Sequence, residues 1–560
     1  MNHSFSIRCR ACKHETEYTQ PYTSCPKCGQ GWLDAVYDLE AVAAQWPQSL
    51  SRRGASLWRY RDLLPIRQVE HIVTLGEGWT PLIQAHNLGL LLGHDHIYIK
   101  DERQGPTASF KDRQATVAIS VMKEAGVKEV VVASTGNVAI AYAAFCARAG
   151  IKLWTFVTSS VPAEKMREVA LYGAEVIKVA GTYDQCKQVA NEFAATKGIY
   201  LDKGIRAISS KEAMKTLAFE IAEQLGSIRG GSDYTVPNPG YFPWKAPDWY
   251  LQSVSGGLGP VGVMKGFREL KAMGLIDKIP KLALFQVAGC APMVNGFQQN
   301  SPVALDVDNP VTDIATLATG RPGEAYEVLR ELILTHGGIM EAVSDAEAFR
   351  ALHVLAKMDG LSVEPATGVT FAGLFNLIHR GVIGRDETVV VNCSGHTFPV
   401  EKHIVGDQYT RDMVLDQPAA ASGREEGLVT ALEELDPRVQ RIAIIEDNAD
   451  ATRLIRRILQ AQGDFLIEEA NNGLDGLQLI RHTRPNLVIL DLMMPGLDGF
   501  GVVEAMKQDA ALYDIPIIVI TAKTLTPTEK RWLDSQVDGL WEKGSFMDVD
   551  LLRHIRKKLP

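Results

Sequence analysis

The sequence lacks the long apolar runs of a membrane protein. No stretch of about 18 consecutive apolar residues, the length that a transmembrane helix needs, occurs in its 560 residues. The first ten residues are polar and mixed in character, so they lack the apolar core of a secretory signal peptide. We therefore expect a cytoplasmic protein with no membrane partner.

An excess of positive charge is also missing. The formal net charge is -9, and 22% of the residues are charged. Proteins that bind the phosphates of nucleic acids usually carry a basic patch, so we expect no nucleic-acid partner. The hydrophobic share of 46% is ordinary for a globular protein. Because domains usually contain about 100–200 residues, the length predicts several domains.

Cysteine is scarce beyond the first thirty residues. The later cysteines are single residues in apolar segments, which is typical of buried thiols in a cytosolic chain: Cys146, Cys186, Cys290 and Cys393.

Two Cys-x-x-Cys pairs lie near the start of the chain. They are Cys9 with Cys12 and Cys25 with Cys28, and Gly29 suits the tight turn after the second pair. Two such pairs can direct four thiolates to one tetrahedral zinc ion. We predict a structural zinc site, with disulfides or a chance arrangement as the alternatives.

Apolar β-like runs alternate with helical periodicity through most of the chain. Residues 129–134, 152–158 and 388–394 are such runs, and the alternation favours βαβ units with a mostly parallel sheet. Small and polar residues at 417–428 then suggest a linker, and a second β/α pattern follows. The predicted divisions are a Cys-rich segment at 1–40, a catalytic domain at 41–409, a linker at 410–438 and a last domain at 439–560.

A lysine follows Ser109 and Phe110 in the segment 98-YIKDERQGPTASFKDRQA-115. A helix is predicted to begin there, with Ser109 as its N-cap. The positive end of the helix dipole lowers the pKa of an amine, and a neutral amine is what Schiff-base chemistry requires. Lys111 is therefore a candidate catalytic residue, with a solvated surface lysine as the alternative.

Two loops have the character of anion-binding sites. The segment 133-ASTGNVAIAYAA-144 joins a strand to an Ala-rich helix, and the amides there would suit an amino-acid carboxylate. The alternative is an ordinary turn capped by Ser134 or Thr135. The glycine-rich turn 253-SVSGGLGPVG-262 could hold a phosphate or a nucleotide with its main-chain amides. It lacks the GxxxxGK[ST] pattern, which argues against a P-loop ATPase.

In this order, KDERQGPTASFKDR, ASTGN, SGGLG and 392-NCSGHT-397 resemble the motifs of threonine synthase and its relatives among the fold-type II pyridoxal-phosphate enzymes. The resemblance covers residues 5–405 and includes 76-GEGWTPL-82, 289-GCAP-292 and 364-EPATG-368. It implies an α/β fold with two open sheets and a pyridoxal 5'-phosphate cofactor.

The resemblance also implies a role for each matching residue. Lys111 would form the Schiff base with the cofactor and act as the catalytic base. The Ser394 hydroxyl would meet the pyridine nitrogen and leave it largely unprotonated, which favours elimination chemistry. The other implied cofactor contacts are Phe110, Asn137, Gly256, Gly257, Leu258 and Gly259. The implied contacts of the substrate carboxylate are Ser134, Thr135 and Gly136.

The implied reaction converts O-phosphohomoserine, a small phosphorylated amino acid, to threonine and phosphate. Members of this family are often dimeric, so a homodimer is possible. The turn SGGLG departs from the GNxGN pattern of the family, and the segment 208–216 keeps only Lys215 and Thr216 of its motif. These changes are expected on the substrate or phosphate side. They leave open a β-replacement enzyme acting on O-phosphoserine, similar to cysteate synthase, and a non-catalytic signalling scaffold.

The last domain places polar side chains at the ends of apolar strands. Glu446 and Asp447, Asp491, Thr521 and Lys543 each follow such a strand, and in a doubly wound sheet these ends share one edge. Grouped carboxylates suit Mg²⁺. Unrelated strand-capping residues are the alternative.

Residues 439–560 resemble the response-regulator receiver family, which has a flavodoxin-like, doubly wound fold. The resemblance implies Asp491 as the phospho-acceptor, with Thr521 and Lys543 contacting the phosphoryl group. It implies a histidine kinase or a phosphotransfer protein as partner, and a modulation of activity or assembly by phosphorylation. The implied magnesium ligands are Glu446, Asp447, Asp491 and the Met493 carbonyl.

Overall fold

The structure is a computed structural model in two parts, each described here by itself. Three features predicted above lie outside the described residues: Thr135, Lys543 and the linker at 410–438. The structure describes residues 5–19, 22, 24–134, 136–158, 161, 163–228, 243–396, 440–460, 465–521 and 525–542.

The N-terminal segment forms a small antiparallel sheet in the order β2-β1-β3. Its strands are β1 (Ser6–Cys9), β2 (Glu15–Glu17) and β3 (Leu33–Val36). Phe5, Ile7 and Leu33 bury their side chains together on one side of it. Each Cys-x-x-Cys pair lies at a turn beside these strands, so the sheet brings the two pairs together.

A six-stranded sheet in the order β12-β11-β10-β13-β5-β4 forms the centre of the catalytic part. Only β4 runs antiparallel to its neighbour. Strands β5, β10 and β13 are buried along their whole length, as expected for parallel strands covered on both faces. The strands are β4 (Leu82–Gln84), β5 (Ile97–Asp101), β10 (Trp249–Ser253), β11 (Lys281–Val287), β12 (Gly338–Val343) and β13 (Val389–Cys393).

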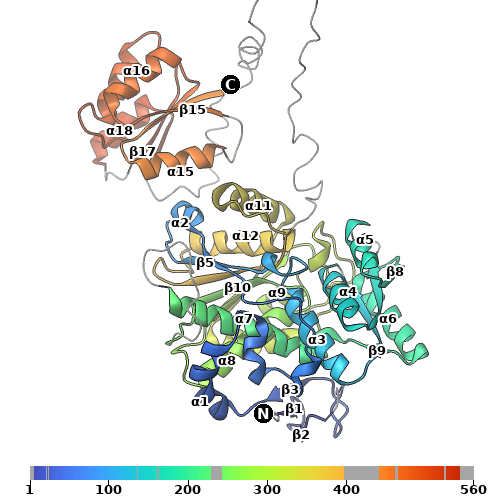
Figure 1. The fold of residues 1–560 in the computed structure, drawn as a ribbon. Coiled ribbons are helices and arrows are strands. Elements are labelled where there is room, and N and C mark those ends of the chain that lie inside the picture. The colour runs from blue at the N-terminus through green and yellow to red at the C-terminus, as the bar shows by residue number, and fades with distance from the viewer. Residues whose placement is uncertain are drawn as a thin grey trace, which may run out of the picture. The chain divides into compact units, whose positions relative to one another are not determined.

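A second, fully parallel sheet has the order β8-β7-β6-β9. Helix α4 packs against β6 and β7 from one side and α6 from the other, as can be followed in Figure 1. The two open sheets confirm the predicted α/β architecture. The elements are β6 (Glu129–Ser134), α4 (Asn137–Ala149), β7 (Lys152–Thr158), α5 (Ala163–Leu171), β8 (Glu175–Val179), α6 (Tyr183–Lys197) and β9 (Tyr200–Leu201).

The remaining helices of this part include a buried pair, α7 and α8, which pack along each other. Helices α3 and α4 also lie side by side (Figure 1). The helices are α1 (Leu39–Ser49), α2 (His86–Leu92), α3 (Lys111–Glu124), α7 (Ile208–Ser227), α8 (Leu258–Ala272), α9 (Pro292–Gln298), α10 (Glu324–His336), α11 (Asp345–Asp359) and α12 (Pro365–His379). Short 3-10 turns lie at Leu50–Arg52, Leu57–Leu63, Val69–His71, Glu102–Gln104, Gly204–Arg206 and Ala315–Leu317.

A buried ion network ties α3 to α7. Arg113 of α3 pairs with Glu102 at 2.7 Å and with Glu220 of α7 at 2.6 Å, and Lys100 of β5 pairs with Glu220 at 2.7 Å. All four side chains are almost fully buried. Since buried charges are tolerated only when they are paired, this network fixes the helix that begins at Lys111.

A second buried network lies between α7, α8 and the N-terminal sheet. Lys215 pairs with Glu212 at 2.6 Å and with Glu269 of α8 at 3.0 Å. Its ammonium nitrogen lies 4.0 Å from the ring centre of Tyr37. Lys215, which segment 208–216 keeps from the family motif, therefore uses its charge in internal packing.

The receiver part is a five-stranded parallel sheet in the order β15-β14-β16-β17-β18. Separate apolar clusters cover its two faces. The order and the direction of the strands confirm the predicted doubly wound fold. The elements are β14 (Gln440–Ile445), α15 (Ala449–Gln460), β15 (Phe465–Ala470), α16 (Gly473–Thr483), β16 (Leu487–Leu490), α17 (Gly499–Gln508), β17 (Ile517–Thr521), α18 (Pro527–Gln536) and β18 (Gly539–Glu542).

Across the described ranges of both parts, none of the helices has the combined length and apolar character that crossing a bilayer requires.

Candidate active site and phosphoacceptor site

Three predicted site segments leave the same edge of the six-stranded sheet. Strand β13 pairs in parallel with β10 on one side and with β5 on the other. The glycine-rich turn follows β10, Ser394 follows β13, and the loop to Lys111 follows β5. The carboxyl edge of a parallel sheet is where ligands bind in open α/β folds, so the topology brings these segments to one place.

Helix α3 begins at Lys111, as predicted, but its N-cap is Phe110 and not Ser109. The backbone of Ser109 forms a β-bridge with Gly395, and the Phe110 N–H donates to the Ser394 carbonyl at 2.9 Å. These long-range bonds hold residues 109–110 against the loop after β13. Lys111 and Ser394 are therefore held together by the main chain itself.

The amine of Lys111 lies in a half-buried position at the start of α3. Burial lowers the pKa of Lys111 to about 8, although the nearby Glu364 carboxylate acts in the opposite direction. The neutral amine, which a nucleophilic lysine requires, is therefore far more populated near neutral pH than in a solvated lysine.

Glu364 connects two of the predicted cofactor-binding residues. Its Oε2 accepts a hydrogen bond from Asn137 Nδ2 at 2.6 Å, and its Oε1 accepts one from Ser394 Oγ at 2.7 Å. The side chain is only 4% exposed. Asn137 and Ser394 thus converge on a single buried carboxylate, which also acts electrostatically on Lys111. Sequence analysis missed Glu364 as a site residue; the only signal was its place in 364-EPATG-368.

The loop after β6 has the geometry of an anion site. Ser134 Oγ accepts hydrogen bonds from the amides of Gly136 and Ala139, both at 3.0 Å. The hydroxyl still has a hydrogen to donate. Gly136 has a φ of 139°, in the region open to glycine. Lys165 Nζ donates to Asn137 Oδ1 at 3.2 Å and so adds a positive charge beside this loop.

Lys165 was also missed by sequence analysis. It lies on α5, which is separated from the loop by helix α4 and strand β7, and a single lysine on an amphipathic helix usually indicates only a solvated face. Here a Cβ on Gly136 would lie 3.2 Å from the Lys165 side chain, so the two residues are in direct contact.

The glycine-rich turn opens helix α8. Gly257 is the N-cap with φ 85°, and a Cβ on Gly259 would lie 2.4 Å from Gln252. A Cβ on Gly256 would meet nothing within 4 Å, so that position faces open space. The turn therefore places bare main chain at the N-terminus of a long helix, which suits a phosphate group. Leu258 is the first helical residue and is buried.

These features fit pyridoxal phosphate. The amine, the phosphate cradle and a hydrogen-bonding side chain for the ring nitrogen all come from the loops at one sheet edge. Ser109 Oγ, next to the lysine loop, is a buried hydroxyl for which the described residues offer no hydrogen-bond partner. A buried polar atom without a partner requires an explanation, and an absent ligand atom or water would supply one.

The receiver part gathers its acidic residues at the carboxyl edge of β14 and β16. Ligand oxygens of Glu446, Asp447 and Asp491 all lie within 4.8 Å of one another. Glu446, Asp491 and Thr521 are buried, whereas Met493 is 58% exposed. Three carboxylates this close repel one another unless a cation binds, and the oxygen-rich set suits Mg²⁺.

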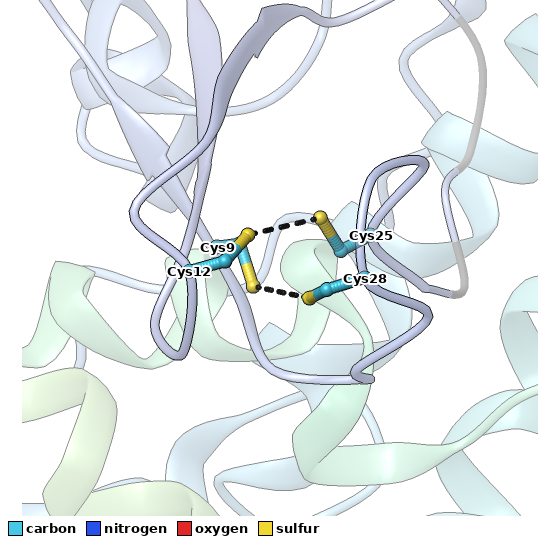
Figure 2. Close-up of side chains that lie close together, drawn as sticks. All are labelled: Cys9, Cys12, Cys25 and Cys28. Atoms are coloured by element: carbon cyan, nitrogen blue, oxygen red, sulfur yellow. Dashed lines mark hydrogen bonds between the residues drawn. The ribbon is translucent and has the colours of Figure 1, made fainter.

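The four N-terminal thiols converge as predicted. Figure 2 shows Cys9 and Cys12 facing Cys25 and Cys28, with Sγ–Sγ distances of 3.6 Å for Cys9–Cys28 and 3.7 Å for Cys12–Cys25. Both distances exceed a disulfide bond of about 2.05 Å and are close to the separation of about 3.8 Å expected in a tetrahedral Zn–S4 site. The thiols are free, and the cluster could hold a metal ion.

Two protein families match the chain. The family described as pyridoxal-phosphate dependent enzyme matches residues 73–395, and that described as response regulator receiver domain matches residues 442–556. Threonine synthase of Methanocaldococcus jannaschii is 34% identical over 391 residues, covering 70% of this chain and 91% of the relative. Threonine synthase of Methanosarcina acetivorans is 33% identical over 393 residues, with the same two coverages of 70% and 91%.

Among solved structures, the processed form of threonine deaminase isoform 2 from Solanum lycopersicum is similar, with 22% identity, a TM-score of 0.48 and coverage of 58% of this chain and 83% of that one. The family match and the relatives agree with the site at the sheet edge. The chain therefore belongs to the pyridoxal-phosphate-dependent enzymes, as a threonine synthase-like lyase of fold-type II that also carries a response regulator receiver domain.

Proposed function

We propose that the enzyme converts O-phosphohomoserine to threonine and inorganic phosphate. The observation that carries this proposal is the group formed by Lys111, Asn137 and the buried Glu364, with the cationic Lys165 beside it. The curated relatives named threonine synthase support the choice of reaction.

Separate residues would bind the cofactor and transfer the protons. Pyridoxal phosphate, when bound, supplies the electron-withdrawing group that makes the α-hydrogen of the substrate acidic. The cofactor would be held by Lys111 and Asn137, by the turn at 256–259 and by Ser394, with Phe110 packed close by. Lys111 Nζ, whose pKa of about 8 suits a base near neutral pH, removes and returns protons.

The anion loop would orient the substrate. The Ser134 hydroxyl, Thr135 and the Gly136 main chain bind its carboxylate, and Lys165 adds a charge for the second anionic group. A charge-assisted hydrogen bond to phosphate or carboxylate is stronger than a neutral one. This arrangement selects amino acids that carry a second negative charge.

The test is a substrate screen in which phosphate release is followed with O-phosphohomoserine and with O-phosphoserine. The expected result is turnover of O-phosphohomoserine that is lost in the Lys111→Ala variant. Phosphate release from O-phosphoserine alone would instead assign a reaction at the β-carbon of that substrate, and loss of neither signal in the variant would contradict the role of Lys111.

We further propose that Asp491 accepts a phosphoryl group from a histidine kinase or a phosphotransfer protein. Glu446, Asp447, Asp491 and the Met493 carbonyl would bind Mg²⁺, while Thr521 and Lys543 would contact the phosphoryl oxygens. The clustering of the three carboxylates supports this assignment. Phosphorylation with a small phosphodonor, followed by activity and mass measurements, separates an effect on catalysis from an effect on dimer formation.

For the N-terminal cluster we propose a structural zinc ion bound by Cys9, Cys12, Cys25 and Cys28. Four thiols around one centre form a closed ligand set with no position left for a substrate. Its function would be to hold the small sheet together, because that sheet buries few side chains of its own.

A further inference from the structure

The carboxyl group of Glu364 is held in one position by the main chain. The Glu364 N–H donates to the Gly395 carbonyl at 3.0 Å, and a Cβ on Gly395 would lie 3.0 Å from Glu364 Oε1. Glu364 is also the N-cap residue of α12. The carboxylate is therefore fixed against the loop that carries Ser394.

The Ser394 hydroxyl has a single hydrogen to donate. It lies 2.7 Å from Glu364 Oε1 and 2.9 Å from Thr367 Oγ1, and the Ser394 N–H donates to Thr367 Oγ1 at 3.0 Å. An ionised carboxylate accepts hydrogen bonds and cannot donate them. The Ser394 hydrogen must then point to Glu364, and the Thr367 hydroxyl donates to Ser394 Oγ.

Asn137 donates to the second carboxyl oxygen of Glu364. The Lys165 ammonium can only donate, so Asn137 Oδ1 faces Lys165 and its Nδ2 faces Glu364 Oε2. The carboxylate therefore accepts from a donor on each oxygen. The other titratable groups that face it are the Lys111 amine and the buried Cys393 thiol.

We propose that Glu364, acting through Ser394, sets the protonation of the cofactor's ring nitrogen and keeps it protonated. With its hydrogen committed to Glu364, Ser394 Oγ presents a lone pair to a ring nitrogen beside it. A hydrogen bond then forms only if the nitrogen carries the proton. A neutral nitrogen would place two lone pairs against each other.

This inference rests on the proposed position of the ring nitrogen at Ser394, and it changes the expectation from sequence. A serine hydroxyl alone donates to the nitrogen and leaves it unprotonated. A serine committed to a carboxylate does the opposite, because the carboxylate takes the only hydrogen. Glu364 is thus a positioning residue that strengthens electron withdrawal at the substrate's α-carbon without touching the substrate.

The experiment uses full-length protein loaded with pyridoxal phosphate that is labelled with ¹⁵N in the ring. The wild-type ring nitrogen is expected to resonate at the position of a pyridinium. In Glu364→Gln, the amide oxygen faces Asn137 and the amide NH₂ donates to Ser394 Oγ, which frees the serine hydrogen. The resonance is then expected to shift to the position of a free pyridine nitrogen.

Thr367→Val is the matched control. It removes a hydrogen bond from the same serine and leaves the carboxylate in place, so the pyridinium resonance should stay. A wild-type resonance at the free-pyridine position overturns the inference, even if Glu364→Gln cannot be purified. An unchanged resonance in a loaded Glu364→Gln protein overturns it as well.

The outcome is distinguishable from a failure of the proposed function. Attachment of the cofactor is read from its absorption band, which should disappear in Lys111→Ala, and substrate choice is read from phosphate release. A protein that shows the band and releases phosphate from O-phosphohomoserine, yet has an unprotonated ring nitrogen, contradicts only the role of Glu364.

Discussion

The ammonium group of Lys165 donates a 3.2 Å hydrogen bond to Oδ1 of Asn137. This contact joins helix α5 to the start of helix α4, and both helices pack against the β8-β7-β6-β9 sheet. It lies at the loop that we propose binds the substrate carboxylate. It gives a positive charge to a loop that otherwise offers only amides and hydroxyls.

Replacing Lys165 with Met should therefore weaken substrate binding. A hydrogen bond to a charged group contributes about 1.5–3 kcal/mol, which corresponds to a loss of about 10- to 100-fold in kcat/KM. Steady-state phosphate release should show the loss mainly as a raised KM. Lys197→Met, at an exposed lysine in the last turn of α6, is the matched control. Equal values of kcat and KM in the two variants would contradict a role of Lys165 in substrate binding.

The low pKa of Lys111 predicts how its removal affects stability in the cofactor-free protein. Burial favours the neutral amine and lowers the pKa to about 8, whereas an unfolded lysine titrates near about 10.4. Below pH 8 the folded protein carries a disfavoured charge, and this cost disappears as pH rises to the unfolded value.

Lys111→Met should accordingly be more stable than the wild type at pH 7, and this advantage should shrink above pH 8. Urea unfolding of both proteins at several pH values measures the difference, in which the titration of all other groups largely cancels. A difference that stays constant from pH 7 to pH 10 would show that the amine is not buried.

The pair formed by Arg113 and Glu220 predicts a large effect on stability. Arg113→Met leaves Glu102 and Glu220 buried with fewer partners, and breaking a buried pair from one side costs about 3–5 kcal/mol. Denaturant unfolding is the measurement. Arg321→Met, which breaks an exposed pair with Asp308, should cost no more than about 1 kcal/mol. Similar losses in both variants would contradict a special role for the buried network.

Much of this architecture could be predicted from sequence, because local pattern determines it. The apolar runs predicted at 129–134, 152–158 and 388–394 contain strands β6, β7 and β13, and the helix predicted at Lys111 begins there. The wrong N-cap at Ser109 has a long-range cause, since its backbone pairs with Gly395.

The residues that sequence missed depend on contacts between distant segments. Glu364 meets Asn137 across 227 positions of the chain. Lys215 and Glu212 have the spacing of an exposed helical ion pair, but both are buried. No local sequence pattern distinguishes these buried contacts from exposed ones, so they can be recognised only in the tertiary structure.

Asp491→Asn should abolish labelling of the receiver by a small phosphodonor in the presence of Mg²⁺. The matched control is Asp498→Asn: this residue is the N-cap of α17, and asparagine caps a helix about as well as aspartate. Intact mass should increase by one phosphoryl group in the wild type and in the control only. Equal labelling of Asp491→Asn would place the phosphoacceptor elsewhere.

Metal content tests the thiol cluster. The purified protein should contain about one zinc per chain, and Cys9→Ser should lose most of it together with thermal stability. Cys186→Ala, at a buried cysteine of α6, should keep the metal. Wild-type protein that carries no metal after purification without chelators would contradict the assignment.

The contact between the N-terminal sheet and α8 matters for anyone who shortens this protein. The Ala35 carbonyl accepts a 2.7 Å hydrogen bond from Lys265, and the Tyr37 ring covers Lys215. A version that starts at residue 41 would lose both contacts and open two lysines and their glutamate partners to water. The first forty residues thus shield buried charged side chains of the catalytic part from water. The solubility of a shortened protein should therefore be measured before its kinetics.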